Sequence, residues 1–395
     1  MKRFFSYSIL SFFLLLLPTG QASANNNDSI RLSLLTCAPG EEIYSLFGHT
    51  AIRYENSSQG IDVVFNYGLF SFNTPNFIFR FSLGETDYQL GATDYERFAA
   101  EYAFFGRSVW QQTLNLTDEE KTELIRLLQE NYRPENRVYR YNFFYDNCAT
   151  RPRDKIEESI AGKVIYPAEP QDGSLTFRDI VHQYCKGHPW ARFGIDLCIG
   201  SEADQPITQR QMMFAPFYLM DAFDGAQIKG DSIQRPLITA NELIVDATPE
   251  PDESDWMPTP LQCSLLLFIL TAAATIYGIR RRTGLWGIDL FLFGIAGIVG
   301  CVLAFLALFS QHPAVSSNFL LLVFHPGQLL FLPYIIYCVR KGKKCWYLTL
   351  NLAVLTLFIV LFPVIPHRFD FAVVPLALVL LIRSASNLIV TSKKK

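Results

Sequence analysis

The 395 residues divide into an acidic front and a basic tail, although the formal net charge is only −3. Residues 1–260 hold 22 Lys and Arg against 35 Asp and Glu, whereas residues 261–395 hold 12 against 2. The tail has the composition of membrane spans with basic flanks, which excludes a soluble cytoplasmic enzyme. Because the sizeable soluble portion is acidic and repels phosphate, no nucleic-acid partner is expected.

The first residues predict export. Two cations precede an apolar run, and Ala22-Ser23-Ala24 supplies the small residues that a signal peptidase reads. We therefore expect residues 1–24 to be a signal peptide. Residues 25–245 mix strand-like and helical patterns and predict an α+β periplasmic domain with an antiparallel sheet. An acidic, proline-containing linker follows at residues 246–260.

Five apolar stretches follow the linker and form a predicted all-α membrane domain, residues 261–395. Each is near the ~20 residues that a bilayer core requires. Basic residues cluster after the first, third and fifth stretches, which the positive-inside rule assigns to the cytoplasm. This alternation predicts five membrane spans with a cytoplasmic C-terminus. The stretches are residues 261–279, 285–309, 318–338, 346–362 and 370–390.

Several ionisable side chains lie within or beside these stretches. Asp289 and Arg383 are close enough to span ends for their charges to reach the interface. His325 lies mid-span before Pro326, a position that predicts a broken helix lining a polar cavity. Because ionisable groups at membrane depth are often functional, we take His325, His312 and Arg383 as candidate lipid-binding residues.

Two soluble segments have structural interpretations. Residues 117–120 read as a capping box that opens a helix to about residue 131, with leucines facing the core. The stretch from Phe70 to Phe81 is rich in aromatic residues. We expect core packing there, with an acyl-binding surface as the alternative for other faces.

Common catalytic motifs are missing, which leaves cysteine as the candidate nucleophile. The sequence has no Cys-x-x-Cys pair, and His49, His182 and His188 lack the spacing of a helical zinc site. It also lacks a glycine-rich phosphate loop and a G-x-S-x-G elbow. We therefore expect no metal and no soluble cofactor.

Four cysteines lie in the predicted periplasmic domain, where two disulfides are the default. Cys185 and Cys198 flank a loop with Gly and Pro and form the expected pair. Cys148 differs, because it lies where an aromatic strand gives way to a helix. The helix dipole and the nearby Arg151 and Arg153 favour a thiolate in that first turn.

A histidine on a predicted hairpin is the candidate base. Residues 45–54 and 61–68 read as two strands joined by a turn-rich segment. Folding about that turn places His49 opposite Asn66 or Tyr67, so that Asn66 would orient the imidazole ring, as in a Cys-His-Asn arrangement. The alternatives are a buried structural histidine and an asparagine at a strand end.

The order of these residues resembles the permuted papain-like thiol enzymes, the group that contains NlpC-type enzymes and lecithin:retinol acyltransferase. More closely, FGHTAIR, LNLTDEE and YNFFYDNCATRPRD are similar to the Lnb N-terminal periplasmic domain family, a resemblance that covers most of residues 30–220. It implies a papain-like, NlpC-like fold joined to membrane spans, and lipoprotein N-acylation in Bacteroidota. The family's catalytic Cys and His fall on Cys148 and His49, whereas the third member stays open.

The expected function is an inner-membrane lipoprotein N-acyltransferase. Cys148 would take an acyl chain from a phospholipid as a thioester and pass it to the α-amine of a diacylglyceryl-cysteine lipoprotein. Backbone N–H groups at the helix start would hold the oxyanion, with Asn147 and Arg151 as auxiliary groups. The alternatives are a membrane-anchored papain-like cysteine amidase or peptidase acting on cell-wall peptides, and a non-enzymatic membrane scaffold.

Overall fold

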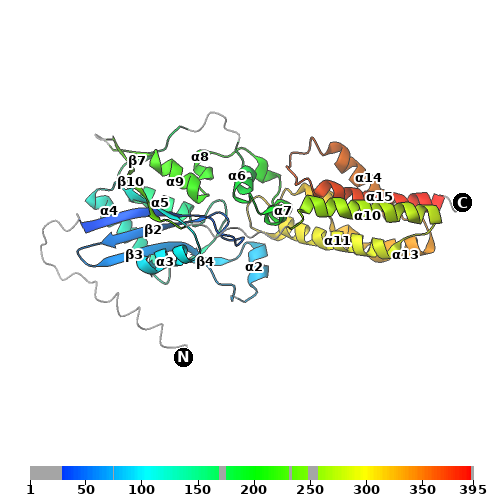
Figure 1. Cartoon of the computed structure of the whole chain (residues 1–395), viewed down its shortest axis with the longest axis horizontal. Coiled ribbons are helices and arrows are strands. Elements are labelled where there is room, and N and C mark those ends of the chain that lie inside the picture. Colours follow the sequence, from blue (N-terminus) through cyan, green and yellow to red (C-terminus); the bar gives the residue numbers. More distant parts are fainter. Residues whose placement is uncertain (1–28, 74, 169–174, 231–233, 248–256, 393–395) are drawn as a thin grey trace, which may run out of the picture.

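The computed structural model describes residues 29–392 except 74, 169–174, 231–233 and 248–256. The expected signal peptide and most of the expected linker lie outside the described residues. Two parts lie end to end along the long axis, an N-terminal domain built on a sheet and a C-terminal domain of helices (Figure 1).

A seven-stranded sheet is the frame of the N-terminal domain. Its order is β10-β5-β1-β2-β3-β4-β6, and every neighbouring pair is antiparallel. The predicted α+β class with an antiparallel sheet is therefore confirmed. A second sheet joins three short strands in the order β7-β8-β9. The strands are β1 (Ile30–Cys37), β2 (His49–Asn56), β3 (Ile61–Leu69), β4 (Asp87–Asp94), β5 (Val109–Leu114), β6 (Val138–Arg140), β7 (Lys163–Ile165), β8 (Gln227–Lys229), β9 (Gln234–Pro236) and β10 (Ile238–Val245).

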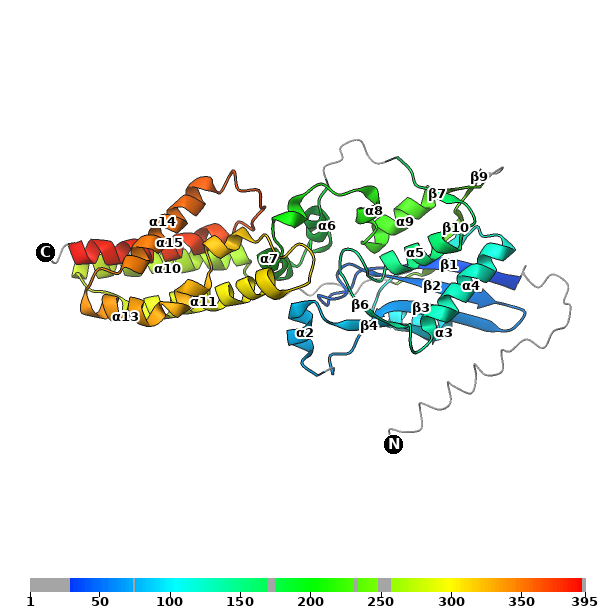
Figure 2. The ribbon, with the colours of Figure 1, turned by 180° about the vertical axis from the view of Figure 1, so that it is seen from behind.

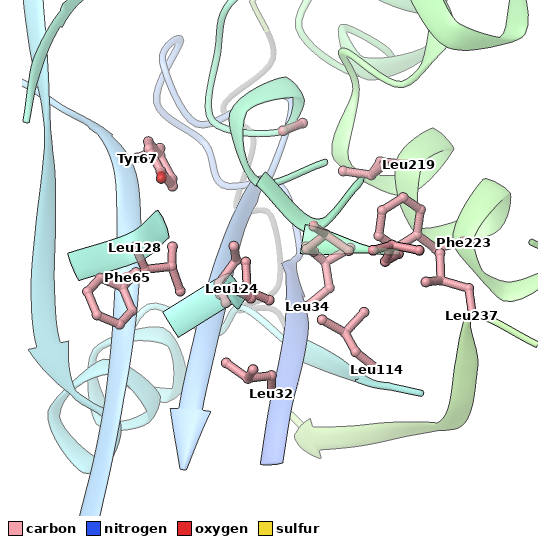
Figure 3. Packing of buried hydrophobic residues seen from close by; sticks show 14 of the residues in the cluster. Leu32, Leu34, Phe65, Tyr67, Leu114, Leu124, Leu128, Leu219, Phe223 and Leu237 are labelled. Carbon is pink, nitrogen blue, oxygen red and sulfur yellow. The ribbon is translucent and has the colours of Figure 1, made fainter. Parts of the chain in front are cut away.

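Helices cover both faces of the large sheet. One face packs against α4 (Asp118–Tyr132), α5 (Thr150–Ser159) and α9 (Pro216–Asp224), and the other against α3 (Tyr95–Phe104). Figure 3 shows Leu124 and Leu128 of α4 over Leu34 and Phe65 of the strands. The predicted capping box is present at the start of α4, where the Thr117 side chain accepts from the Glu120 N–H.

A smaller group of helices lies between the sheet and the helical domain. It contains α2 (Phe77–Leu83), α6 (Phe177–Tyr184), α7 (Pro189–Cys198), η2 (Ser201–Asp204) and α8 (Gln209–Met212). The fully buried Arg178 of α6 bonds Asp196 of α7 and Asp204 of η2, both at 2.7 Å. This ion cluster fixes α6, α7 and η2 to one another, because a buried charge is stable only with such partners.

The helical domain reproduces the predicted apolar stretches. Three helices, α10, α11 and α15, are long and apolar enough to cross a membrane, and α14 is shorter. The third stretch is interrupted before Pro326, as predicted, but its 74° bend lies later, at Phe331, between residues 319–330 and Leu332–Lys341. The count of five spans stays a prediction. The elements are α10 (Pro260–Arg281), α11 (Trp286–Phe309), η3 (Phe319–Leu322), α12 (Pro326–Leu330), α13 (Leu332–Lys341), α14 (Trp346–Leu361) and α15 (Val373–Ser392).

The two ends of this helical domain differ in their loops. The basic ends of α10 and α13 and the last turns of α15 lie away from the sheet domain, as Figure 2 shows. There the Asn387 side chain bonds both the Lys343 carbonyl and the Cys345 N–H, which ties the loop after α13 to α15. The loops at the other end, which we call the near-end loops, bond the N-terminal domain instead. For example, the Gly200 N–H donates to the Ala314 carbonyl at 2.6 Å. The basic ends of α10 and α13 therefore lie at the same end of the domain, as the positive-inside pattern requires.

One expectation about the helical domain is wrong. Asp289 and Arg383 do not extend toward the interface; they pair with each other at 2.7 and 3.0 Å, and Arg383 is only 3% exposed. Arg383 also donates to the Thr275 hydroxyl. A buried pair is favoured over snorkelling here because each charge satisfies the other without water.

Candidate active site

The expected His–Asn contact is present at the end of the sheet that faces the helical domain. β2 begins at His49, and the His49 Nε2 lies 3.2 Å from the Asn66 Oδ1 of β3. The register pairs Ala51 with Asn66, so His49 meets Asn66 diagonally across the two strands instead of directly opposite it. Since an amide oxygen can only accept, Nε2 carries the proton and the lone pair is on Nδ1.

The glycine before His49 is required by the backbone. Gly48 has a φ of 77°, and a Cβ there would lie 2.5 Å from the Cys37 carbonyl oxygen. Cys37 is the β1 residue that pairs with His49. Gly48 therefore lets the chain turn tightly into β2 and sets the position of the imidazole.

The Asn147 side chain caps the helix that follows the candidate nucleophile. Its Oδ1 accepts from the N–H groups of Ala149 and Thr150, and its Nδ2 donates to the carbonyls of Phe143 and Phe214. Asn147 is 2% exposed and all its bonding capacity is used, so its side chain cannot donate to an oxyanion. It is a positioning residue, and oxyanion donors have to be backbone N–H groups.

Cys148 is a free, half-buried thiol two residues before the start of α5. Burial raises the pKa of Cys148 to about 11, against hydrogen bonds from the Thr50 N–H, the Tyr141 hydroxyl and its own N–H that lower it. The expectation that helix dipole and arginines favour a resting thiolate is therefore wrong. The helix begins only at Thr150, so the sulfur lies outside its first turn and the cost of desolvation dominates.

Arg151 does not act on the sulfur either. Its guanidinium bonds both carboxylate oxygens of Asp146, at 2.6 and 2.7 Å, and lies 3.5 Å over the Tyr139 ring. Its charge is thus compensated by a carboxylate on the same loop. Arg151 holds the chain just before and after Cys148 in place, as Asn147 does.

The imidazole is neutral in the same setting. Burial lowers the pKa of His49 to about 4, and the bond to Asn66 offsets only part of this change. At neutral pH the site therefore holds a thiol and an unprotonated imidazole. An unprotonated imidazole is the form that can accept a proton from the thiol.

Gly68 allows the nucleophile to approach the sheet. It has a φ of 89°, and a Cβ at this position would lie 3.5 Å from both the Cys148 Cβ and the Tyr141 ring. The irregularity in β3 between Asn66 and Leu69 produces this close approach. Cys148 is consequently packed against the two strand ends that supply His49 and Asn66.

Two partners of the thiol were not found from the sequence, namely Tyr141 and the backbone of Thr50. Tyr141 stacks on Tyr88 of β4 with ring centroids 4.2 Å apart, which aims its hydroxyl at the sulfur. Alternation along the strand before Cys148 would have indicated that Tyr139 and Tyr141 share a face. Nothing in the sequence indicates the Thr50 contact.

The expected disulfide is wrong, because all eight cysteines are free. The segment between Cys185 and Cys198 is not a loop. It contains the ten-residue helix α7, about 15 Å long, which begins four residues after Cys185 and ends at Cys198. A disulfide needs Cα atoms less than about 7 Å apart.

The candidate lipid-binding residues are all engaged by the protein. His312 donates to the Phe81 carbonyl at 2.5 Å, and His325 contacts the Asn351 Oδ1 at 3.3 Å inside the helical domain. Arg383 is held by Asp289. None of these three side chains lies beside Cys148, and a role in lipid binding stays a prediction. No cluster of three or more metal-ligating side chains occurs in the part of the chain that the structure describes.

Comparison with known families covers both domains. The family model for the Lnb N-terminal periplasmic domain matches residues 20–182, which include His49, Asn66 and Cys148. The model for the Lnb transmembrane domain matches residues 252–395. The chain matches no curated protein and no solved structure. The relation to papain-like enzymes therefore stays a prediction.

Proposed function

The chain belongs to the Lnb family, with its periplasmic and its transmembrane domain, and on this premise we propose that it is a lipoprotein N-acyltransferase of the inner membrane. Its donor is a phospholipid and its acceptor is the α-amine of a diacylated lipoprotein. Cys148 is the nucleophile, His49 the base and Asn66 the group that orients His49.

One observation carries the proposal: the candidate site lies at the end of the sheet that faces the membrane domain. β3 ends at Leu69 beside the site, and the chain continues into α2, whose Leu83 carbonyl accepts from the Gln311 N–H just beyond α11. The position of a free thiol and a neutral imidazole at this end supports substrates that reside in the membrane. A cell-wall amidase would have no need for this position.

The first half-reaction forms a thioester. His49 Nδ1 accepts the Cys148 proton while the sulfur attacks the acyl carbonyl of the phospholipid ester. The tetrahedral intermediate expels the lysophospholipid alkoxide, which takes the proton back from His49. The N–H groups of Cys148 and Thr50, which bond the sulfur in the resting enzyme, are the donors we assign to the oxyanion.

The second half-reaction releases the acyl chain. The lipoprotein α-amine attacks the thioester carbonyl and loses a proton to His49. The thiolate leaves and recovers that proton, so the amide product and the resting thiol are formed together. Asn66 stabilises the imidazolium at both steps through the bond to Nε2.

The test is expression in a strain that lacks its own lipoprotein N-acyltransferase, followed by mass spectrometry of the N-terminal lipopeptide. We expect triacylated lipoprotein with the wild type and none with Cys148→Ala or His49→Ala. Asn66→Ala should slow conversion by about 10- to 100-fold, since an orienting group contributes less than the nucleophile.

Matched controls separate chemistry from folding. Cys198→Ala removes another half-buried free thiol, and His188→Ala removes a histidine at the start of α7. Both should retain full conversion. Conversion that persists in Cys148→Ala would refute the assignment, and cleavage of cell-wall peptides by the wild type would favour the amidase instead.

A further inference from the structure

An apolar strip projects from the site end of the sheet domain. We use this name for Phe70, Phe72, Phe77, Ile78, Phe79 and Phe81, on and before α2. Ile78 is 80% exposed, Phe72 is 65% exposed and Phe79 is 57% exposed, and α2 buries none of its residues. The expected core role is therefore wrong for most of the strip. A soluble domain rarely exposes so many large apolar side chains together without a partner.

The strip lies against the membrane domain at the level of its outer surface. The Phe79 ring lies 5.9 Å from that of Phe305, which is one turn inside α11 and thus about 6 Å below its end. Phe81 packs on His312 just beyond that helix. Interfacial helices bury their apolar face to about this depth.

Arg80, the cation of α2, does not prevent α2 from lying at the membrane surface. The Arg80 guanidinium lies 2.8 Å from the Asp87 carboxylate and 3.0 Å from the Glu85 carbonyl. It therefore turns back toward β4, away from the exposed rings. Ile78 and Phe79 are left as an uncharged surface.

A continuous series of ring contacts joins the strip to the nucleophile. Tyr141, which bonds the Cys148 sulfur, stacks on Tyr88 at 4.2 Å. Tyr88 contacts Phe70 at 5.1 Å, and Phe70 stacks on Phe77 at 5.7 Å. Phe77 in turn stacks on Phe81, beside the end of α11. Apolar contact thus runs from the membrane surface to the thiol.

We propose that the apolar strip enters the outer leaflet and binds the acyl chains of the donor phospholipid, guiding the ester to Cys148. The occupant is lipid acyl chain, because the strip continues the apolar surface of α11. This inference rests on the proposed acyl transfer for its purpose. The lipid contact can be tested without it.

The first experiment uses full-length Cys148→Ala protein in phosphatidylethanolamine nanodiscs that contain a diazirine-acyl phosphatidylethanolamine. After illumination, cross-linked peptides are mapped by mass spectrometry. We expect adducts on Ile78 or Phe79 as well as on α11, and none on Ile165 of β7, which is 39% exposed at the far end of the sheet domain (Figure 1). Adducts on α11 without any on α2 would overturn the proposal, whatever the enzyme's activity.

The second experiment uses kinetics. The double variant Ile78→Glu/Phe79→Glu should raise the KM for phospholipid in mixed micelles about 10-fold or more, because two apolar contacts are lost. Its rate of Cys148 acylation by the soluble donor p-nitrophenyl butyrate should match the wild type. Ile165→Glu is the control and should change neither value. Equal losses with both donors would show a folding effect and contradict the proposal.

Discussion

The hydroxyl of Tyr141 should control how much thiolate Cys148 can form. Replacing Tyr141 with Phe removes one of the hydrogen bonds that lower the thiol pKa and leaves the ring stack on Tyr88 in place. A hydrogen bond to a charged group contributes about 1.5–3 kcal/mol. At 1.36 kcal/mol per pKa unit, the pKa of Cys148 should rise by about 1–2, so the thiolate fraction at fixed pH falls about 10- to 100-fold.

The assay is alkylation of Cys148 by iodoacetamide in the purified full-length protein, followed at pH 9 by peptide mass spectrometry. Tyr139→Phe is the matched control. The Tyr139 hydroxyl is buried nearby, yet it has no hydrogen-bond partner among the described residues. Its removal should leave the alkylation rate unchanged. Equal rates for Tyr141→Phe and wild type, or an equal fall in Tyr139→Phe, would refute the reasoning.

Two further outcomes follow from the charges described above. His49 is unprotonated above its pKa of about 4, and Cys148 stays protonated below its pKa of about 11. The rate of thioester formation should therefore be constant from about pH 6 to pH 9. A narrow maximum near pH 7 in a pH–rate profile would contradict this. Asp289→Asn or Arg383→Met alone should destabilise the protein by about 3 kcal/mol or more, while Asp289→Leu/Arg383→Met together should recover most of that loss. Thermal unfolding in detergent measures the stability of the single and the double variants. A double variant whose loss of stability equals the sum of the two single losses would argue against a buried pair.

Local patterns were sufficient for much of the fold. The capping box at Thr117 and the apolar stretches depend on residues close together in the chain, so they can be predicted from a single sequence. The His49–Asn66 contact could also be predicted, because the two residues lie on strands that a tight hairpin joins. The register differed from the expected one because the turn between β2 and β3 is centred later than we assumed.

Properties that depend on distant packing were not predictable in this way. The Cys148 pKa is set by burial and by Tyr141, whose position depends on β4. The pair of Asp289 and Arg383 joins residues far apart in the chain. The apolar strip was misassigned because aromatic residues predict burial without indicating whether protein or lipid provides it.

The bonds between the near-end loops and the sheet domain also limit how the two domains can change. Glu202 accepts from Ser316 and Ser317, Asn318 donates to the Leu197 carbonyl, and Arg368 pairs with Asp179. A domain attached only by a linker could be exchanged between relatives as a cassette. In this protein the two partners of each bond lie in different domains. A chimera would therefore lose these contacts unless both contacting surfaces came from the same protein. The two domains therefore have to be inherited together.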